Sequence, residues 1–180
     1  MGRLGAYKVD LKGLENDRAS YNWTVDQDFF SLVEGEDVQK GKVSVDLKVE
    51  KRSGVYLLSF SLNGIVVVTC DRCLDDMQLN IETTGDMKVK LGADFADDGD
   101  IIIVPENDGT VNVAWYIYEF ISLAIPLKHV HSPGKCNKDM MEKLDEHLTT
   151  EEGESEGTEE SAGTDSRWDE LKNIIETNND

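Results

Sequence analysis

Three cysteines and two closely spaced histidines are the side chains of this sequence best suited to binding a metal ion. Cys70 and Cys73 form a C-x-x-C motif, and 62 residues separate Cys73 from Cys136. His129 and His131 lie a few positions before Cys136. Thiolate and imidazole ligands suit a tetrahedral Zn²⁺ ion. The three cysteines with either histidine therefore predict a Cys₃His zinc site.

Two other interpretations of the cysteines stay open at this point. The gap between Cys73 and Cys136 is much longer than the spacing in compact zinc fingers, so the cysteines could be reduced structural thiols. A redox-active pair is the third interpretation. In thioredoxin-like proteins such a pair lies between a strand and the N-terminus of a helix, where the helix dipole lowers the thiol pKa. Strands are expected on both sides of this motif, which disfavours redox chemistry.

Residues for catalysis are scarce in this sequence. It has three histidines, and two of them belong to the candidate metal site. It contains no P-loop, no G-x-G-x-x-G motif and no nucleophile elbow. Its carboxylates fall mainly at predicted solvent-facing positions or in the C-terminal segment. We therefore expect a protein that is not an enzyme.

The charge balance limits the partners that the chain can bind directly. Of its 180 residues, 18 are basic and 37 are acidic, and the formal net charge is −19. Contact with phosphates needs clustered Lys and Arg, so bulk electrostatic binding to nucleic acid or to an anionic membrane is disfavoured. No apolar run reaches the length of a membrane span, and the N-terminus lacks the apolar core of a signal peptide. The sequence predicts a cytoplasmic protein.

Alternating apolar and polar residues predict three long antiparallel strands in a meander. They cover residues 43–49, 56–70 and 77–91, and the second strand is expected to contain a bulge at residues 63–64. Residues 52–54 supply the first turn. The second turn carries the C-x-x-C motif.

A largely apolar helix is expected over residues 113–125, with Asn112 as its cap. Its polar positions form one narrow stripe, so nearly all of its surface should be buried against the sheet. The expected fold class is α+β. A bent antiparallel sheet, which could be partly closed, packs on this one buried helix. This domain should span residues 1–147.

The C-terminal segment differs in composition from the rest of the chain. Over residues 148–180, acidic side chains outnumber basic ones eleven to two. Residues 148–164 are rich in Glu, Ser, Gly and Thr and predict a disordered acidic linker. Residues 165–180 place Trp168 and Leu171 on one face of a short amphipathic helix. This helix could dock on its own domain or bind a partner.

Taken in order, the motifs resemble those of the YceD family of bacterial proteins. The family pattern is a C-x-R-C-L turn after a long strand, a helix with Glu followed by L-x-x-P, a His before a third Cys, and a terminal D-P-R-W/F peptide. The resemblance covers residues 56–136 and the terminal peptide, in which Ser166 replaces the usual Pro. The matching positions are Cys70, Arg72, Cys73, Leu74, Glu119, Leu123, Pro126, His131, Cys136, Asp165, Arg167, Trp168, Leu171 and Lys172.

The resemblance implies a role in the accumulation, processing or stability of 23S rRNA, and hence in assembly of the large ribosomal subunit. It also favours His131 as the fourth member of the metal site. The strongly negative net charge suits contact with a basic ribosomal protein of a large-subunit precursor better than direct contact with rRNA. An adaptor stabilised by a metal or containing free thiols, with no ribosomal role, is the alternative.

Partner binding is expected at two groups of residues. Any direct contact with rRNA should be confined to the locally basic positions near the cysteines, and the terminal peptide should supply a second contact. The basic positions are Arg72, Lys128, Lys135 and Lys138, and the peptide positions are Arg167, Trp168 and Leu171.

Overall fold

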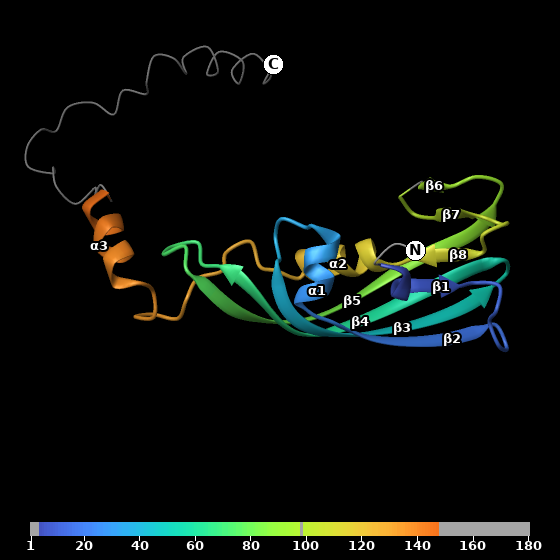
Figure 1. Ribbon diagram of the computed structural model, residues 1–180, viewed down its shortest axis with the longest axis horizontal. Helices are drawn as coiled ribbons and strands as arrows, with labels where there is room; N and C mark the ends of the chain where they lie inside the picture. Colours follow the sequence, from blue (N-terminus) through green and yellow to red (C-terminus); the bar gives the residue numbers. More distant parts are fainter. Residues whose placement is uncertain (1–3, 98, 148–180) are drawn as a thin grey trace, which may run out of the picture. The chain divides into compact units, whose positions relative to one another are not determined.

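A bent sheet of six strands forms the body of the part of the chain that the structure describes, residues 4–97 and 99–147 (Figure 1). In this computed structural model, the described residues as far as Leu144 form one compact unit. The elements in chain order are η1 (Gly5–Tyr7), β1 (Lys8–Asp10), β2 (Arg18–Val25), α1 (Gln27–Val33), β3 (Lys40–Arg52), β4 (Val55–Thr69), β5 (Asp76–Gly92), β6 (Ala96–Asp97), β7 (Ile102–Pro105), β8 (Thr110–Asn112), α2 (Ala114–Leu123) and α3 (Lys138–His147).

The sheet combines an antiparallel meander with one parallel pair. Its strand order is β2-β3-β4-β5-β7-β6, and within the first four strands each adjacent pair is antiparallel. β7 pairs parallel with β5, and β6 pairs antiparallel with β7. A separate small sheet pairs β1 with β8. The predicted α+β class and antiparallel meander are therefore confirmed.

The main sheet is open, so the partial closure considered from the sequence does not occur. β2 forms one edge and β6 forms the other. Closure would require these two edges to exchange backbone hydrogen bonds. β6 is only two residues long and pairs with β7 alone. The two edge strands, β6 and β2, therefore do not pair with each other.

The first turn of the meander forms as predicted, whereas the predicted bulge does not. Ser53 and Gly54 connect β3 to β4 with φ values of 50° and 81°. Two residues with positive φ make the tight hairpin turn whose twist matches that of the flanking strands. Pairing then continues without interruption along all of β3, so residues 63–64 contain no bulge.

Gly64 explains why the regular pairing holds at the position of the expected bulge. A Cβ atom there would lie 2.3 Å from the carbonyl oxygen of Lys42 and 2.6 Å from the Cα of Val43. Both are backbone atoms of β3, so a side chain could not be accommodated by a rotamer change. Glycine therefore allows the two strands to approach closely. Glycine within a strand can mark such a close approach of another backbone as well as a bulge.

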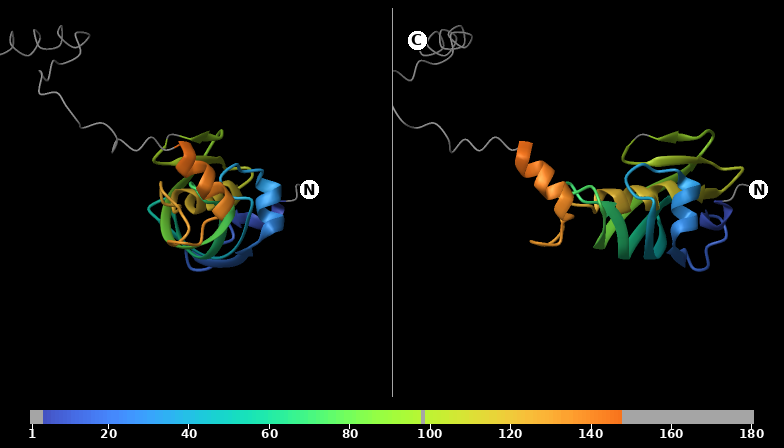
Figure 2. Two further views of the ribbon diagram at one scale, coloured as in Figure 1. Left: turned by 90° about the vertical axis from the view of Figure 1, so that its left-hand side faces the viewer. Right: turned by 60° about the vertical axis from the view of Figure 1, so that its left-hand side comes forward.

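Helix α2 packs against the concave side of the sheet (Figures 1 and 2). It buries Ile117 and Ile121 in the core, and its Phe120 ring lies 5.2 Å from the ring of Phe60 on β4. Its first residue is Ala114, whose N–H donates to the side-chain oxygen of Asn112 at 3.0 Å. The helix is therefore slightly shorter than the predicted 113–125. Its N-cap residue is Val113 and not the predicted Asn112, although the Asn112 side chain accepts the first N–H of the helix.

The prediction that α2 is buried on nearly all sides is wrong. Trp115 is 51% exposed and Leu123 is 82% exposed, so two large apolar side chains face solvent on this helix. The apolar pattern indicated burial around the whole helix. A single sheet covers only one side, and the opposite face lies open.

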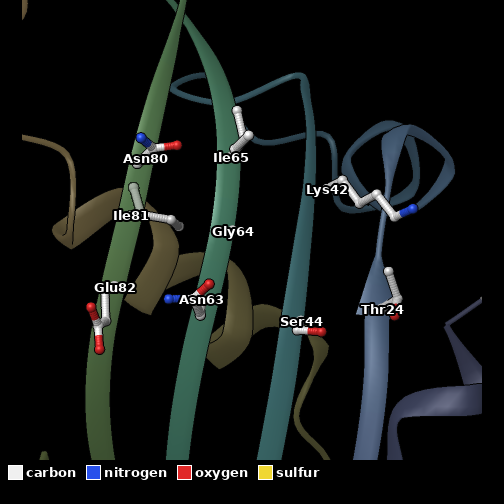
Figure 3. Close-up of a pocket in the computed structure, with 9 residues that line it drawn as sticks. All are labelled: Thr24, Lys42, Ser44, Asn63, Gly64, Ile65, Asn80, Ile81 and Glu82. Carbon is white, nitrogen blue, oxygen red and sulfur yellow. The ribbon is translucent and has the colours of Figure 1, made fainter.

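Polar side chains cover the outer face of the sheet. Thr24, Ser44, Asn63 and Glu82 lie next to one another across β2, β3, β4 and β5 (Figure 3). Together with Lys42 they border a shallow hollow of about 710 Å³. This is the solvated side of a sheet that buries its other face, as the alternating pattern predicted.

The predicted linker (148–164) and the predicted terminal helix (165–180) lie outside the described residues. Among the helices that the structure does describe, none is long and apolar enough to cross a membrane.

Candidate metal centre

The C-x-x-C motif occupies the tight turn between β4 and β5. The N–H of Leu74 donates to the carbonyl of Cys70 at 3.0 Å, and the N–H of Cys70 donates to the carbonyl of Asp75 at 2.9 Å. Leu74 adopts a left-handed conformation with φ 61°, which is uncommon for a residue with a side chain of this size. These bonds close the turn with the Cys70 and Cys73 side chains buried.

The chain that follows α2 runs along this turn and is joined to it by two short hydrogen bonds. The N–H of Asp71 donates to the carbonyl of His129 at 3.0 Å, and the N–H of His129 donates to the Asp71 carboxylate at 2.7 Å. The N–H of His131 points to the sulfur of Cys70 at 3.4 Å. The second half of the predicted site is therefore brought to the first.

Four side chains converge on one point between these segments. The ligand atoms of Cys70, Cys73, His131 and Cys136 all lie within 4.8 Å of one another. The two sulfurs of Cys70 and Cys136 are 4.0 Å apart, and the Cys73 sulfur is 3.3 Å from Nδ1 of His131. Tetrahedral zinc with Zn–S bonds of about 2.3 Å and Zn–N bonds of about 2.0 Å requires separations of about 3.5–3.8 Å. The arrangement could hold a metal such as zinc.

The structure also distinguishes between the two histidines. His131 belongs to the cluster through Nδ1, whereas the ring of His129 faces away to other partners. Nε2 of His129 lies 3.4 Å from the Asp71 carboxylate, and its Nδ1 lies 3.1 Å from the carbonyl of Pro126. His129 therefore joins the two segments that carry the ligands, while His131 supplies the ligand atom.

Backbone N–H groups surround the first two sulfurs and favour their thiolate forms. Burial raises the pKa of the Cys70 thiol, but hydrogen bonds from the N–H groups of Cys73, Arg72 and His131 together outweigh it and lower the pKa to about 6. The N–H of Asn137 is the largest influence on Cys73 and lowers its pKa despite burial. A metal ion binds the thiolate, so this environment prepares two of the three cysteines for it.

The surroundings of the other two members favour their protonated forms. Burial and the neighbouring sulfurs of Cys73 and Cys70 raise the pKa of Cys136 to about 11. Hydrogen bonds to Cys70 and Cys73 raise the pKa of His131. Gathering negative sulfurs in this small space is unfavourable without a compensating charge, and a divalent cation would supply that charge.

A family model described as "Large ribosomal RNA subunit accumulation protein YceD" matches residues 58–175. The match covers well over half of the chain. The protein belongs to the YceD family. Comparison with curated proteins and with solved structures found no match. The range shared with the YceD family includes all four residues of the cluster, the whole of α2 and most of the C-terminal segment, which confirms the resemblance drawn from the motifs.

The four basic positions predicted for rRNA contact surround this YceD cluster in the chain. Arg72 lies between the two cysteines of the turn, and Lys128, Lys135 and Lys138 flank the segment with His131. All four are exposed, and none forms an ion pair with another described residue. The other predicted contact residues, Arg167, Trp168 and Leu171, lie outside the described residues.

Sequence reasoning missed Asp71 and Asn137, and it considered His129 only as a possible ligand and not as a residue that joins the two segments. Asp71 and His129 join the two halves of the cluster, and Asn137 connects the cluster to α3. The Asn137 side chain donates to Asp75 at 3.2 Å and accepts the N–H of Asp139 at 3.1 Å, so it caps α3 while touching the turn. An Asn before an amphipathic run is a recognised helix-start signal and could have revealed this helix.

Proposed function

We propose that this protein supports the accumulation of 23S rRNA and the assembly of the large ribosomal subunit as a non-enzymatic factor of the cytoplasm. The match to the YceD family, which is described by its effect on large ribosomal RNA, carries this proposal. The open sheet and the helices packed on it offer surfaces for contact with a partner. The factor would act by holding a component of the immature subunit.

We assign a structural Zn²⁺ ion to the cluster of Cys70, Cys73, His131 and Cys136. Four protein ligands complete a tetrahedral shell, and a catalytic zinc keeps one position open for water or substrate. A complete shell supports a structural role. Bound there, the ion would join the β4–β5 turn to the segment after α2 and so fix the position of the basic residues around it.

A basic ribosomal protein is the partner that the charge of the chain favours. The net charge of −19 repels the phosphates of rRNA over most of the surface and attracts proteins rich in Lys and Arg. The exposed residues Arg72, Lys128, Lys135 and Lys138 form a local exception near the cluster. Direct contact with rRNA would be confined to this region.

Sedimentation of a cell lysate through a sucrose gradient at low salt tests the proposal. We expect the protein to co-migrate with large-subunit precursors, and cells that lack it to show a reduced ratio of 23S to 16S rRNA. Confinement of the protein to the top fractions, together with an unchanged rRNA ratio, would instead favour an adaptor without a ribosomal role.

A further inference from the structure

A groove is lined by residues of α2 and of the loop that follows α1. Its volume is about 660 Å³. The hydroxyl of Tyr118 on α2 accepts the N–H of Asp37 at 2.9 Å and the N–H of Val38 at 3.3 Å, which fastens the loop to the helix. A Cβ at Gly35 would lie 1.9 Å from the Tyr118 ring, so only glycine lets the loop pass this closely. The groove is therefore formed before any partner binds.

The floor of the groove exposes apolar side chains on a folded helix. Trp115 and Leu123 are eight positions apart, which places them about 12 Å apart along the helix and close to one face. The indole N–H of Trp115 donates to the Glu119 carboxylate at 2.7 Å, so this ring is held in one orientation. An exposed Trp held in place is a frequent anchor of a protein contact, and exposed apolar surface beside it marks an interaction site.

The charge of the groove selects the chemistry of its occupant. Glu34, Glu36 and Asp37 line one side, Glu119 lines the other, and the lining contains no Lys or Arg. Phosphates of RNA would be repelled by these carboxylates. The C-terminal segment, residues 148–180, has eleven acidic and two basic residues and would be repelled as well. A second copy of this chain has the same strongly negative charge.

We propose that this groove binds a basic amphipathic segment of a protein partner. Apolar side chains of the segment would pack on Trp115 and Leu123, while its Lys or Arg side chains would pair with the carboxylates on both sides. Identifying that partner as a ribosomal protein rests on the function proposed above. The binding chemistry rests on the groove alone.

Binding of a fluorescein-labelled model peptide of Leu and Lys, with the spacing of an amphipathic helix, tests this proposal on the full chain. In Leu123→Asp, and in Glu34→Lys with Glu36→Lys, we expect the dissociation constant to rise by about tenfold or more. The matched controls are Phe95→Asp, an equally apolar exposed site elsewhere, and Glu106→Lys with Asp108→Lys, which changes the net charge equally. Both controls should stay within about twofold of the unchanged protein.

Amide NMR spectra locate the bound peptide and separate it from other occupants. Shifts should concentrate at residues 34–37 and 115–123. If the two double charge variants weakened peptide binding equally, the attraction would come from the net charge of the protein, and the proposal would be overturned. Unchanged peptide binding in Leu123→Asp would overturn it as well. The proposal would also fail if a single-stranded RNA, or self-association of the protein, shifted the same amide signals. An increase of about tenfold in peptide affinity after removal of residues 148–180 would mean that this segment occupies the groove, and it would overturn the proposal too.

Two results distinguish a failure of this inference from a failure of the proposed function. If the peptide binds at the groove but the protein stays in the top gradient fractions, the groove is a binding site and its partner is not ribosomal. Co-migration with precursors, with peptide binding unaffected by the groove variants, would reject the groove and keep the ribosomal role.

Discussion

Nδ1 of His131 lies 3.3 Å from the sulfur of Cys73, although 58 positions separate the two residues in the chain. Backbone and carboxylate hydrogen bonds between Asp71 and His129 also join the two segments that carry the ligand residues. A metal ion bound there would strengthen an existing contact between the sheet and the segment after α2.

Zinc analysis is the first check of this arrangement. Protein purified without a chelator should contain about one zinc ion per chain, because the cluster offers one tetrahedral set of ligands. Removing the ion should lower the melting temperature by about 5 °C or more, since each kcal/mol corresponds to about 2–4 °C in a chain of this size. If the purified protein contained no metal and a chelator left its melting temperature unchanged, reduced structural thiols would be the better interpretation of the cysteines.

The two neighbouring histidines provide a matched pair of variants. His131→Ala removes a ligand atom, so zinc affinity should fall by about 100-fold or more, whereas His129→Ala keeps all four ligands and should cost about tenfold at most. Competition with a chromogenic chelator measures both. Equal losses in the two variants would contradict the assignment of His131 as the ligand.

Replacing Tyr118 by Phe should loosen the loop after α1. The variant leaves the N–H groups of Asp37 and Val38 without their acceptor, and the free energy of unfolding should fall by about 1–2 kcal/mol. Tyr21→Phe is the control, because the Tyr21 ring stacks on Trp23 and this contact survives the change. Urea denaturation of both variants measures the difference, and equal stabilities would show that the hydroxyl does not hold the loop.

Gly64→Ala tests the close approach of β3 and β4. The new methyl group would meet backbone atoms of Lys42 and Val43, so we expect a loss of about 1–3 kcal/mol in the free energy of unfolding. Gly5→Ala is the control, since a Cβ at Gly5 meets no atom within 4 Å. A neutral Gly64→Ala variant would mean that the two strands can separate at no cost.

Removal of the chain after His147 separates two roles of the C-terminal segment. If the segment binds a partner, the truncated protein should melt at an unchanged temperature but associate less with ribosomal precursors. Trp168→Ala should reproduce much of that loss, because a Trp on an apolar face is a frequent anchor of binding. A lower melting temperature with unchanged association would show instead that the segment docks on its own domain.

The sequence alone was sufficient for the features that depend on local pattern. The alternation of apolar and polar residues in β3, β4 and β5 predicted their meander. Each strand has one buried and one solvated face, so apolar side chains recur at every second residue. The turn at Ser53 and Gly54 is likewise a property of a few neighbouring residues. The ordered motifs were enough to identify the family.

Features that depend on distant packing could not be predicted in this way. The spacing allowed either His129 or His131 as a ligand, and the family resemblance favoured His131. The structure places His131 in the cluster and gives His129 other partners, Asp71 and Pro126. The apolar pattern of α2 indicated complete burial, and only the open sheet left Trp115 and Leu123 exposed. The type of a residue shows how apolar its side chain is. Which residues surround that side chain in space depends on how the whole chain packs. For that reason the four ligand residues could be predicted from the sequence, while the part that His129 plays in joining the two segments and the groove beside α2 became visible only in the tertiary structure.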